Sequence, residues 1–194
     1  MRPRRWLPCV IVVLASCLGA CAKPPTRGPA DHGTSCAGVG MSTLPGACIR
    51  FLDPAPTFSL AKAAAGVEIA YEVIVEADIS GVVPRAQDAG DCDIPGASGL
   101  TVFERLEGGD LHYCACDSGL CAPFEDDSPR TIPAGRSTQR FTWNGTSWDG
   151  ASDTDNPYGP PMPPGTYVLE VSAVGSVDGA LFEIRNSIEV TLTP

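Results

Sequence analysis

Three segments of the chain alternate apolar and polar residues with the two-residue period of a β-strand. In Val67–Ile79 every odd position is apolar, and carboxylates occupy four of the positions between them. Thr166–Val174 repeats the alternation, and Leu181–Thr193 does so with Asn186 as its one exception. Such segments predict strands with one buried face and one solvated face, and the last two predict a hairpin.

Shorter segments complete an all-β pattern. Leu100–Leu106 and Leu111–Cys116 flank a turn, Glu107-Gly108-Gly109-Asp110, so they predict a second hairpin. Further strands are predicted at Cys48–Leu52, Phe58–Leu60 and Ser137–Trp143. No long helical pattern occurs, and Ala61–Ala65 is expected to be a turn because Gly66 follows it. About seven or eight short strands separated by turns predict an antiparallel β-sandwich.

The first twenty residues have the pattern of an export signal. Met1–Arg5 carries three arginines, and Trp6–Ala20 is an apolar stretch of 15 residues. A helix needs about 20 apolar residues to cross a bilayer, so this stretch is too short to span one. We expect residues 1–20 to be removed.

The residues at the end of this signal predict a lipid site. Leu18-Gly19-Ala20-Cys21 resembles the lipobox of bacterial lipoproteins, in which small residues precede a cysteine whose thiol receives lipid. The resemblance implies that Cys21 becomes the lipidated N-terminus, with an ordinary signal cut after Ala20 as the alternative. Several acyl chains, palmitate among them, bury enough methylene groups for stable anchoring. Ala22 replaces the aspartate that retains such proteins at the inner membrane, which implies an outer-membrane location in a Gram-negative cell envelope.

The domain organisation follows from this start. Residues 21–35 are rich in proline and glycine and lack apolar periodicity, so they predict a lipidated cysteine followed by a flexible tether with a reach of about 20 Å. We expect residues 36–194 to form the folded, disulfide-bonded domain.

Six cysteines remain in that domain and predict a disulfide framework. They are Cys36, Cys48, Cys92, Cys114, Cys116 and Cys121. An even number in an exported domain indicates three bonds, for which 15 connectivities exist. We favour Cys36 with Cys48, and Cys92 with one member of the 114–121 group, whose other two members close a local loop. A metal site on that group, joined by His112, is the alternative.

Charge and motifs exclude several classes of function. The chain has 13 basic and 23 acidic residues, and removing residues 1–20 takes three arginines and no carboxylate, which leaves a net charge of about −13. Nucleic-acid binding requires clustered basic residues, so it is not expected. There is no G-x-S-x-G elbow and no H-E-x-x-H pair. A nucleophile built from His112 and Cys114 is the remaining catalytic alternative, and we expect neither enzymatic activity nor a cofactor.

A motif in residues 131–174 points to a family of sandwiches. Its parts are Thr131–Gly135, Phe141–Gly145, Trp148-Asp149-Gly150 and Pro163–Tyr167. This run resembles the domain of the bacterial intracellular proteinase inhibitors and the immunoglobulin-like domain of flagellar hook-capping proteins. The resemblance implies an immunoglobulin-like sandwich in which Tyr167 faces the core and Trp143 covers its end.

The loop at residues 145–163 is the candidate recognition site. It is long for a strand connection, stiffened by prolines, and carries Trp148 and Tyr158, which predict a binding surface. The alternative is that both rings fold back over the end of the sandwich. Asp149, Asp153, Asp155 and Asn156 offer oxygens at a spacing that suits calcium, but the run lacks the glycine and glutamate of an EF-hand, so we expect no metal.

These observations predict a lipid-anchored, non-enzymatic binding or structural module of the cell envelope. Its partners are the membrane, through Cys21, and an envelope protein. The first alternative is an envelope protease inhibitor that uses the 145–163 loop, and the second is an enzyme of unrecognised type.

Overall fold

The computed structural model describes residues 36–83, 98–114, 128–150 and 156–194. Within these ranges the chain forms eleven strands and one short helix. The strands are β1 (Met41–Ser42), β2 (Ala47–Phe51), β3 (Thr57–Ser59), β4 (Val67–Val75), β5 (Ile79–Gly81), β6 (Val102–Gly108), β7 (Leu111–Cys114), β8 (Arg130–Ile132), β9 (Gly135–Trp143), β10 (Gly165–Val177) and β11 (Ala180–Thr193). The prediction of an all-β sandwich is confirmed, with more strands than the seven or eight expected.

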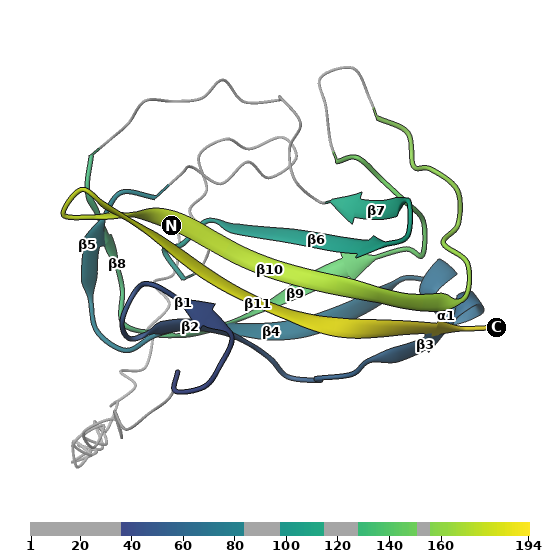
Figure 1. Cartoon of the computed structure of the whole chain (residues 1–194), viewed down its shortest axis with the longest axis horizontal. Coiled ribbons are helices and arrows are strands. Elements are labelled where there is room, and N and C mark those ends of the chain that lie inside the picture. Colours follow the sequence, from purple (N-terminus) through teal and green to yellow (C-terminus); the bar gives the residue numbers. More distant parts are fainter. Residues whose placement is uncertain (1–35, 84–97, 115–127, 151–155) are drawn as a thin grey trace, which may run out of the picture. The chain divides into compact units, whose positions relative to one another are not determined.

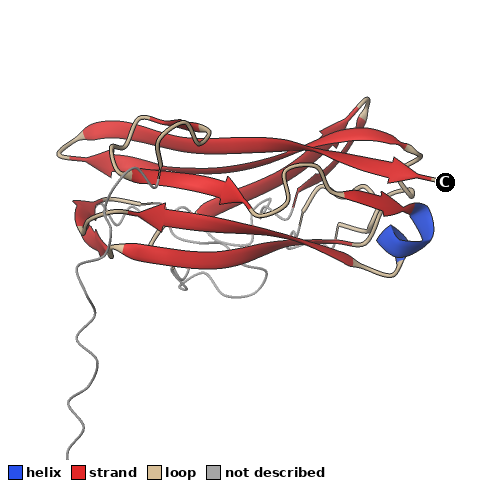
Figure 2. Ribbon diagram, turned by 90° about the horizontal axis from the view of Figure 1, so that it is seen from below, coloured by secondary structure: helices blue, strands red, loops and turns tan. Residues whose placement is uncertain are grey.

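Two sheets make the layers of the sandwich (Figure 1, Figure 2). The larger sheet has the order β1-β11-β10-β6-β7, with β3 also paired to β11, and the smaller sheet has the order β2-β4-β9. Strands β5 and β8 form a separate two-stranded ribbon. All pairings are antiparallel except β3 with β11.

The alternating positions of both sheets meet in one core. Tyr71 of β4, Phe141 and Trp143 of β9, and Leu169 and Val171 of β10 are each no more than 1% exposed. The two predicted hairpins are confirmed. Asp178 and Gly179, both with positive φ, connect β10 to β11, and Gly109, also with positive φ, lies in the turn from β6 to β7.

Asn186, the exception in the alternation of β11, links the two layers. Its side-chain amide donates a hydrogen bond to the Ile49 carbonyl of β2, at 2.9 Å. Strand β2 is an edge strand of the smaller sheet, so this bond satisfies a carbonyl on that edge.

The predicted strand Val67–Ile79 is in fact two strands. Strand β4 ends at Val75, where the Glu76 amide donates to the Gly46 carbonyl at 2.7 Å. The Asp78 carboxylate then accepts a hydrogen bond from the Ala134 amide at 2.6 Å, and β5 begins at Ile79 in a different sheet. The alternation continues through the bend, so the pattern alone could not reveal it.

The expected turn at 61–65 is a short helix, α1 (Leu60–Ala64). The Ser59 hydroxyl caps it by accepting the Lys62 amide at 3.2 Å, and Gly66 follows with φ of +93°. A serine cap before an alanine-rich segment favours one helical turn over an irregular one.

Candidate functional site

The loop between β9 and β10 lies along the free edge of β7. The Trp148 amide donates to the His112 carbonyl at 2.9 Å, and the Cys114 amide donates to the Trp148 carbonyl at 3.0 Å. The loop therefore covers the edge of β7, which the sheet would otherwise leave with unpaired backbone groups.

The second arm of the loop is bonded to the first. Ser147 donates its amide to the Pro160 carbonyl at 2.9 Å and accepts the Gly159 amide at 2.8 Å. Met162, 1% exposed, donates its amide to the Gly145 carbonyl at 2.8 Å. These bonds hold residues 156–162 in one arrangement beside the larger sheet.

Four aromatic rings form a stack from the core to the surface, which we call the aromatic stack: Phe141, Tyr113, Trp148 and Tyr158. Successive ring centroids are 5.6 Å, 5.6 Å and 5.0 Å apart. Phe141 is fully buried, Tyr113 is 6% exposed, Trp148 is partly buried and Tyr158 is 55% exposed. Tyr158, the outermost ring, is therefore connected to the core through contacts with Trp148 and Tyr113.

The two predicted recognition residues have different environments. Trp148 donates its indole N–H to the Asn156 carbonyl at 2.9 Å, and Asn156 donates its side-chain amide to the Gly150 carbonyl at 3.1 Å. Trp148 packs against the core, as the alternative expectation had it. Tyr158 rests on Trp148 but presents more than half of its surface to solvent.

Charged groups lie beside the aromatic stack. His112 Nε2 lies 2.6 Å from Asp149 Oδ1, and the Asp149 side chain is 74% exposed. Burial, together with the smaller effect of the neighbouring charges of Tyr158 and Glu104, raises the pKa of Tyr113 to about 12.

Glu104 connects the stack to a polar cluster between the sheets. The Tyr71 hydroxyl donates to Glu104 Oε1 at 2.6 Å and lies 3.0 Å from Gln139 Oε1. The Gln139 amide is in turn 3.4 Å from the Ser98 hydroxyl. Glu104 itself is partly buried on the inner side of β6.

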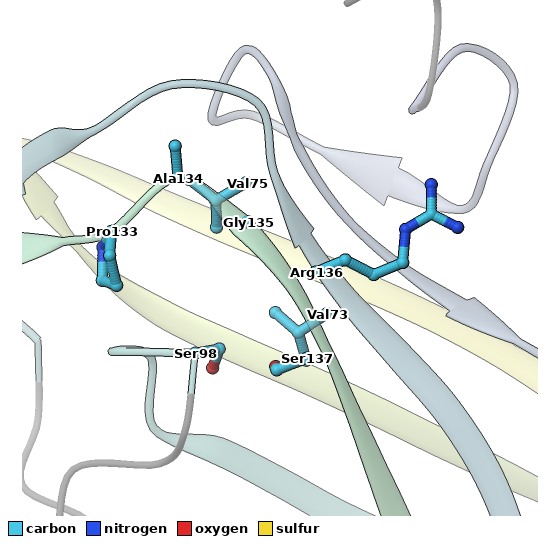
Figure 3. Close-up of a pocket in the computed structure, with 8 residues that line it drawn as sticks. All are labelled: Val73, Val75, Ser98, Pro133, Ala134, Gly135, Arg136 and Ser137. Atoms are coloured by element: carbon cyan, nitrogen blue, oxygen red, sulfur yellow. The ribbon is translucent and has the colours of Figure 1, made fainter. Parts of the chain in front are cut away.

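A small cavity of about 180 Å³ opens near the same cluster (Figure 3). Its lining includes Ser98 and Ser137, together with Val73, Val75 and the segment 133–136. The Ser137 hydroxyl is buried and has no hydrogen-bond partner among the described residues. The lining holds no histidine or carboxylate that could serve as a base for either serine.

The disulfide predicted between Cys36 and Cys48 is confirmed. Cys114 is also disulfide-bonded. A bonded cysteine is neither a metal ligand nor a nucleophile, so both alternatives built on Cys114 are wrong for this residue. Cys21, Cys92, Cys116 and Cys121 lie outside the described residues, and their predicted roles stay predictions.

Asp153 and Asp155 of the acidic run also lie outside the described residues. Within the described ranges, no three histidine, cysteine or carboxylate side chains are grouped closely enough to hold a metal ion.

Sequence reasoning missed Tyr113 and Glu104 as members of the site. Both occur in an ordinary hairpin, and no local pattern links them to residues 148 and 158. Only the return of the loop along β7 brings them together.

No protein-family model matches this chain, and no curated protein matches it either. In the described part of the chain, none of the helical structure has the length and apolar character needed to cross a membrane.

Proposed function

We propose that this chain is a lipid-anchored, non-enzymatic binding module of the cell envelope that recognises a protein partner through the surface around Tyr158. The observation that carries the proposal is the exposure of Tyr158 on a rigid support. An aromatic side chain held in place loses little conformational freedom on binding, so it buries apolar area at low entropic cost.

The position of this surface in the fold supports the proposal. Cys36, where the predicted tether ends, is bonded to Cys48 near the start of β2, and β2 pairs with the C-terminal end of β4. The 145–163 loop begins after Trp143, at the opposite end of β9 and next to α1 (Figure 1). A domain tethered at residue 36 would therefore present the loop away from its attachment.

A photo-crosslinking amino acid at position 158 tests the recognition surface. We expect it to capture a defined envelope protein in intact cells, whereas the same amino acid at Leu181 should not. Leu181 is a matched control because it is 88% exposed and lies beside the β10–β11 turn, away from the loop. Equal amounts of crosslinked product from positions 158 and 181, or no crosslinked product from position 158, would contradict the proposal. Capture of a protease that the chain inhibits would favour the inhibitor alternative.

The anchor is tested separately. The Cys21→Ser variant should remain an unprocessed precursor without an acyl label, because only the thiol accepts the lipid. Normal acylation of this variant would show that Cys21 is not the lipid site.

A further inference from the structure

Strand β9 is an edge strand of the smaller sheet, and its outer side is open in the described part of the chain. It pairs with β4 over its whole length, and the order β2-β4-β9 places no strand on its other side. In an antiparallel pair, about every second residue directs its backbone N–H and C=O away from the partner strand. Among the described residues, none bonds to those groups in residues 136–143. Strand β9 can therefore accept a further strand through main-chain hydrogen bonds.

The other edges of the two sheets are short or covered. Strands β1, β2, β3 and β7 have five residues or fewer. The 145–163 loop bonds to β7, and the Asn186 side chain bonds to the Ile49 carbonyl of β2. With nine residues, β9 is the longest edge strand of either sheet in the described ranges.

The edge of β9 carries positive charge and no carboxylate of its own. Arg136 and Arg140 are the charged residues of this strand. Because they are four positions apart, both side chains lie on the outer face of the smaller sheet, separated by about 13 Å along the strand. Their side chains are 50% and 63% exposed. A strand beside β9 would meet these two guanidinium groups directly.

The carboxylates that pair with these arginines lie one strand further in, on β4. Glu68 Oε2 is 3.4 Å from Arg140 Nε, and Glu72 Oε2 is 3.3 Å from Arg136 Nη1. Arg50 meets the same Glu72 oxygen at 2.6 Å, so one carboxylate faces two guanidinium groups. From a strand added to β9, the β4 carboxylates would be two strand spacings away, about 10 Å. Salt screens charges at that distance and also the formal net charge of −10, so the edge arginines determine the local preference.

The inner face of the same edge favours uncharged side chains. Ser137 and Gln139 lie on this face, opposite the buried Val73 and Tyr71 of β4. The Tyr71 hydroxyl bonds to both Gln139 and the Glu104 carboxylate. A second carboxylate pointing inward would approach Glu104, and burying like charges together is unfavourable. A strand that fits this edge is therefore acidic on its outer face and uncharged on its inner face.

We propose that β9 binds an extended acidic segment of a partner protein by strand addition, with two carboxylates four residues apart paired with Arg136 and Arg140. The main-chain hydrogen bonds supply affinity, and the arginines select the partner. Two copies of this chain are disfavoured as partners, because joining two β9 edges would bring their arginines onto one face. The inference goes beyond the proposed function and does not depend on Tyr158.

Disulfide-closed hairpin peptides test the proposal, because their strands are extended before they bind. The first peptide carries two glutamates four positions apart, on one face of its free strand. The second carries them three positions apart, on opposite faces, and the third has glutamines in place of the glutamates of the first. We expect the full chain to bind the first peptide about threefold more tightly than the second and about tenfold more tightly than the third. N-methylation of the outward amides of the first peptide should abolish binding.

Matched variants locate the binding site. Arg140→Gln should weaken binding of the first peptide about threefold and leave the glutamine peptide unchanged. Arg185→Gln is the control, because it removes an exposed arginine and its ion pairs from β11 in the other sheet, and it should change neither. Bound peptide should also slow hydrogen exchange at alternate amides of residues 136–143. Melting curves show whether each variant keeps its fold.

Four results would overturn the proposal. Equal binding of the first and second peptides would show that attraction is not specific to one face. An effect of Arg185→Gln as large as that of Arg140→Gln would place the peptide elsewhere. Binding without slower exchange in residues 136–143 would exclude strand addition. Slower exchange there on raising the concentration of the chain alone would assign the edge to a second copy. None of these results bears on the crosslinking expected at position 158.

Discussion

The burial of each residue in the aromatic stack determines whether it contributes to folding stability or is accessible for binding. Phe141 and Tyr113 have almost no exposed surface, so their contribution is to the free energy of folding. Trp148 is intermediate, because its ring covers Tyr113 while its indole N–H fixes the loop backbone at Asn156. Tyr158 alone in the stack offers a large accessible face. Truncating Trp148 is therefore expected to cost stability, and truncating Tyr158 to cost recognition.

Tyr113 should titrate at unusually high pH. Its folded pKa is about 12, against an ordinary value of 10, because burial and nearby negative charge disfavour the phenolate. The stability that this difference contributes is present below about pH 10 and is lost as the pH rises towards 12. Between pH 10 and pH 12, the free energy of unfolding should therefore fall less in the Tyr113→Phe variant than in the parent protein. Denaturation curves across this pH range measure the difference.

A neighbouring variant provides the control for this titration. Tyr158→Phe removes one of the charges that raise the pKa of Tyr113, so the phenolate absorbance of Tyr113 should appear at lower pH than in the parent. An unchanged titration would show that the two hydroxyls do not interact.

Substitution of Gly108 tests how closely the backbone packs against the predicted core residue Tyr167. A Cβ at position 108 would collide with the Tyr167 ring, whose hydroxyl donates to the Pro163 carbonyl at 2.7 Å. Gly108→Ala should therefore lower the free energy of unfolding by about 1–3 kcal/mol, measured by urea denaturation. Gly109→Ala has free space around its Cβ, so it should cost only the strain of its positive φ, about 1 kcal/mol. A larger loss at 109 than at 108 would contradict the collision.

At the scale of elements, alternation predicted most strands but not their limits or contacts. Strands β10 and β11 follow the pattern because each has one face in the core, and the side-chain period of a strand is fixed. The bend after Val75 was missed because its cause is a pair of backbone contacts distant in sequence. The path of the 145–163 loop was missed for the same reason. Its length and aromatic content were visible, but its pairing with β7 was not.

The Cys36–Cys48 bond holds the segment before β1 against the smaller sheet. Cys48 is 1% exposed in β2, and the amide of Cys36 donates to Glu76 at 3.3 Å. Replacing both cysteines with serine should cost about 2–4 kcal/mol, because the unfolded chain regains the freedom of the open loop. The hairpins far from this bond should keep their hydrogen-exchange protection. Global loss of protection would show that the bond is required for the whole domain.

At the scale of the molecule, the strands separate the end near Cys36 from the end that carries the proposed recognition loop. Strand β10 has 13 residues, which corresponds to about 40 Å at the rise of an extended chain. The predicted tether of residues 22–35 has a reach of only about 20 Å, shorter than the domain itself. Cys36, where the tether is predicted to join, and the β10–β11 turn lie at one end, and the start of β10 and the end of β11 lie at the other. A tether of this predicted length at one end would restrict which surfaces reach a partner across the proposed envelope location.

This arrangement predicts an orientation that can be measured on vesicles. A fluorescent amino acid placed at 181 should transfer more energy to an acceptor in the lipid headgroups than one placed at 158, because 181 is nearer the attachment. Moving the anchor from Cys21 to a lipid after Pro194 should reverse the order, since the C-terminus lies at the end where the 145–163 loop begins. Cys21→Ser without a new anchor supplies the baseline, as it should not bind the vesicles. Equal transfer from both positions in either anchored form would mean that the domain turns freely on its tether, and access to Tyr158 would then depend on the partner rather than on the position of the anchor.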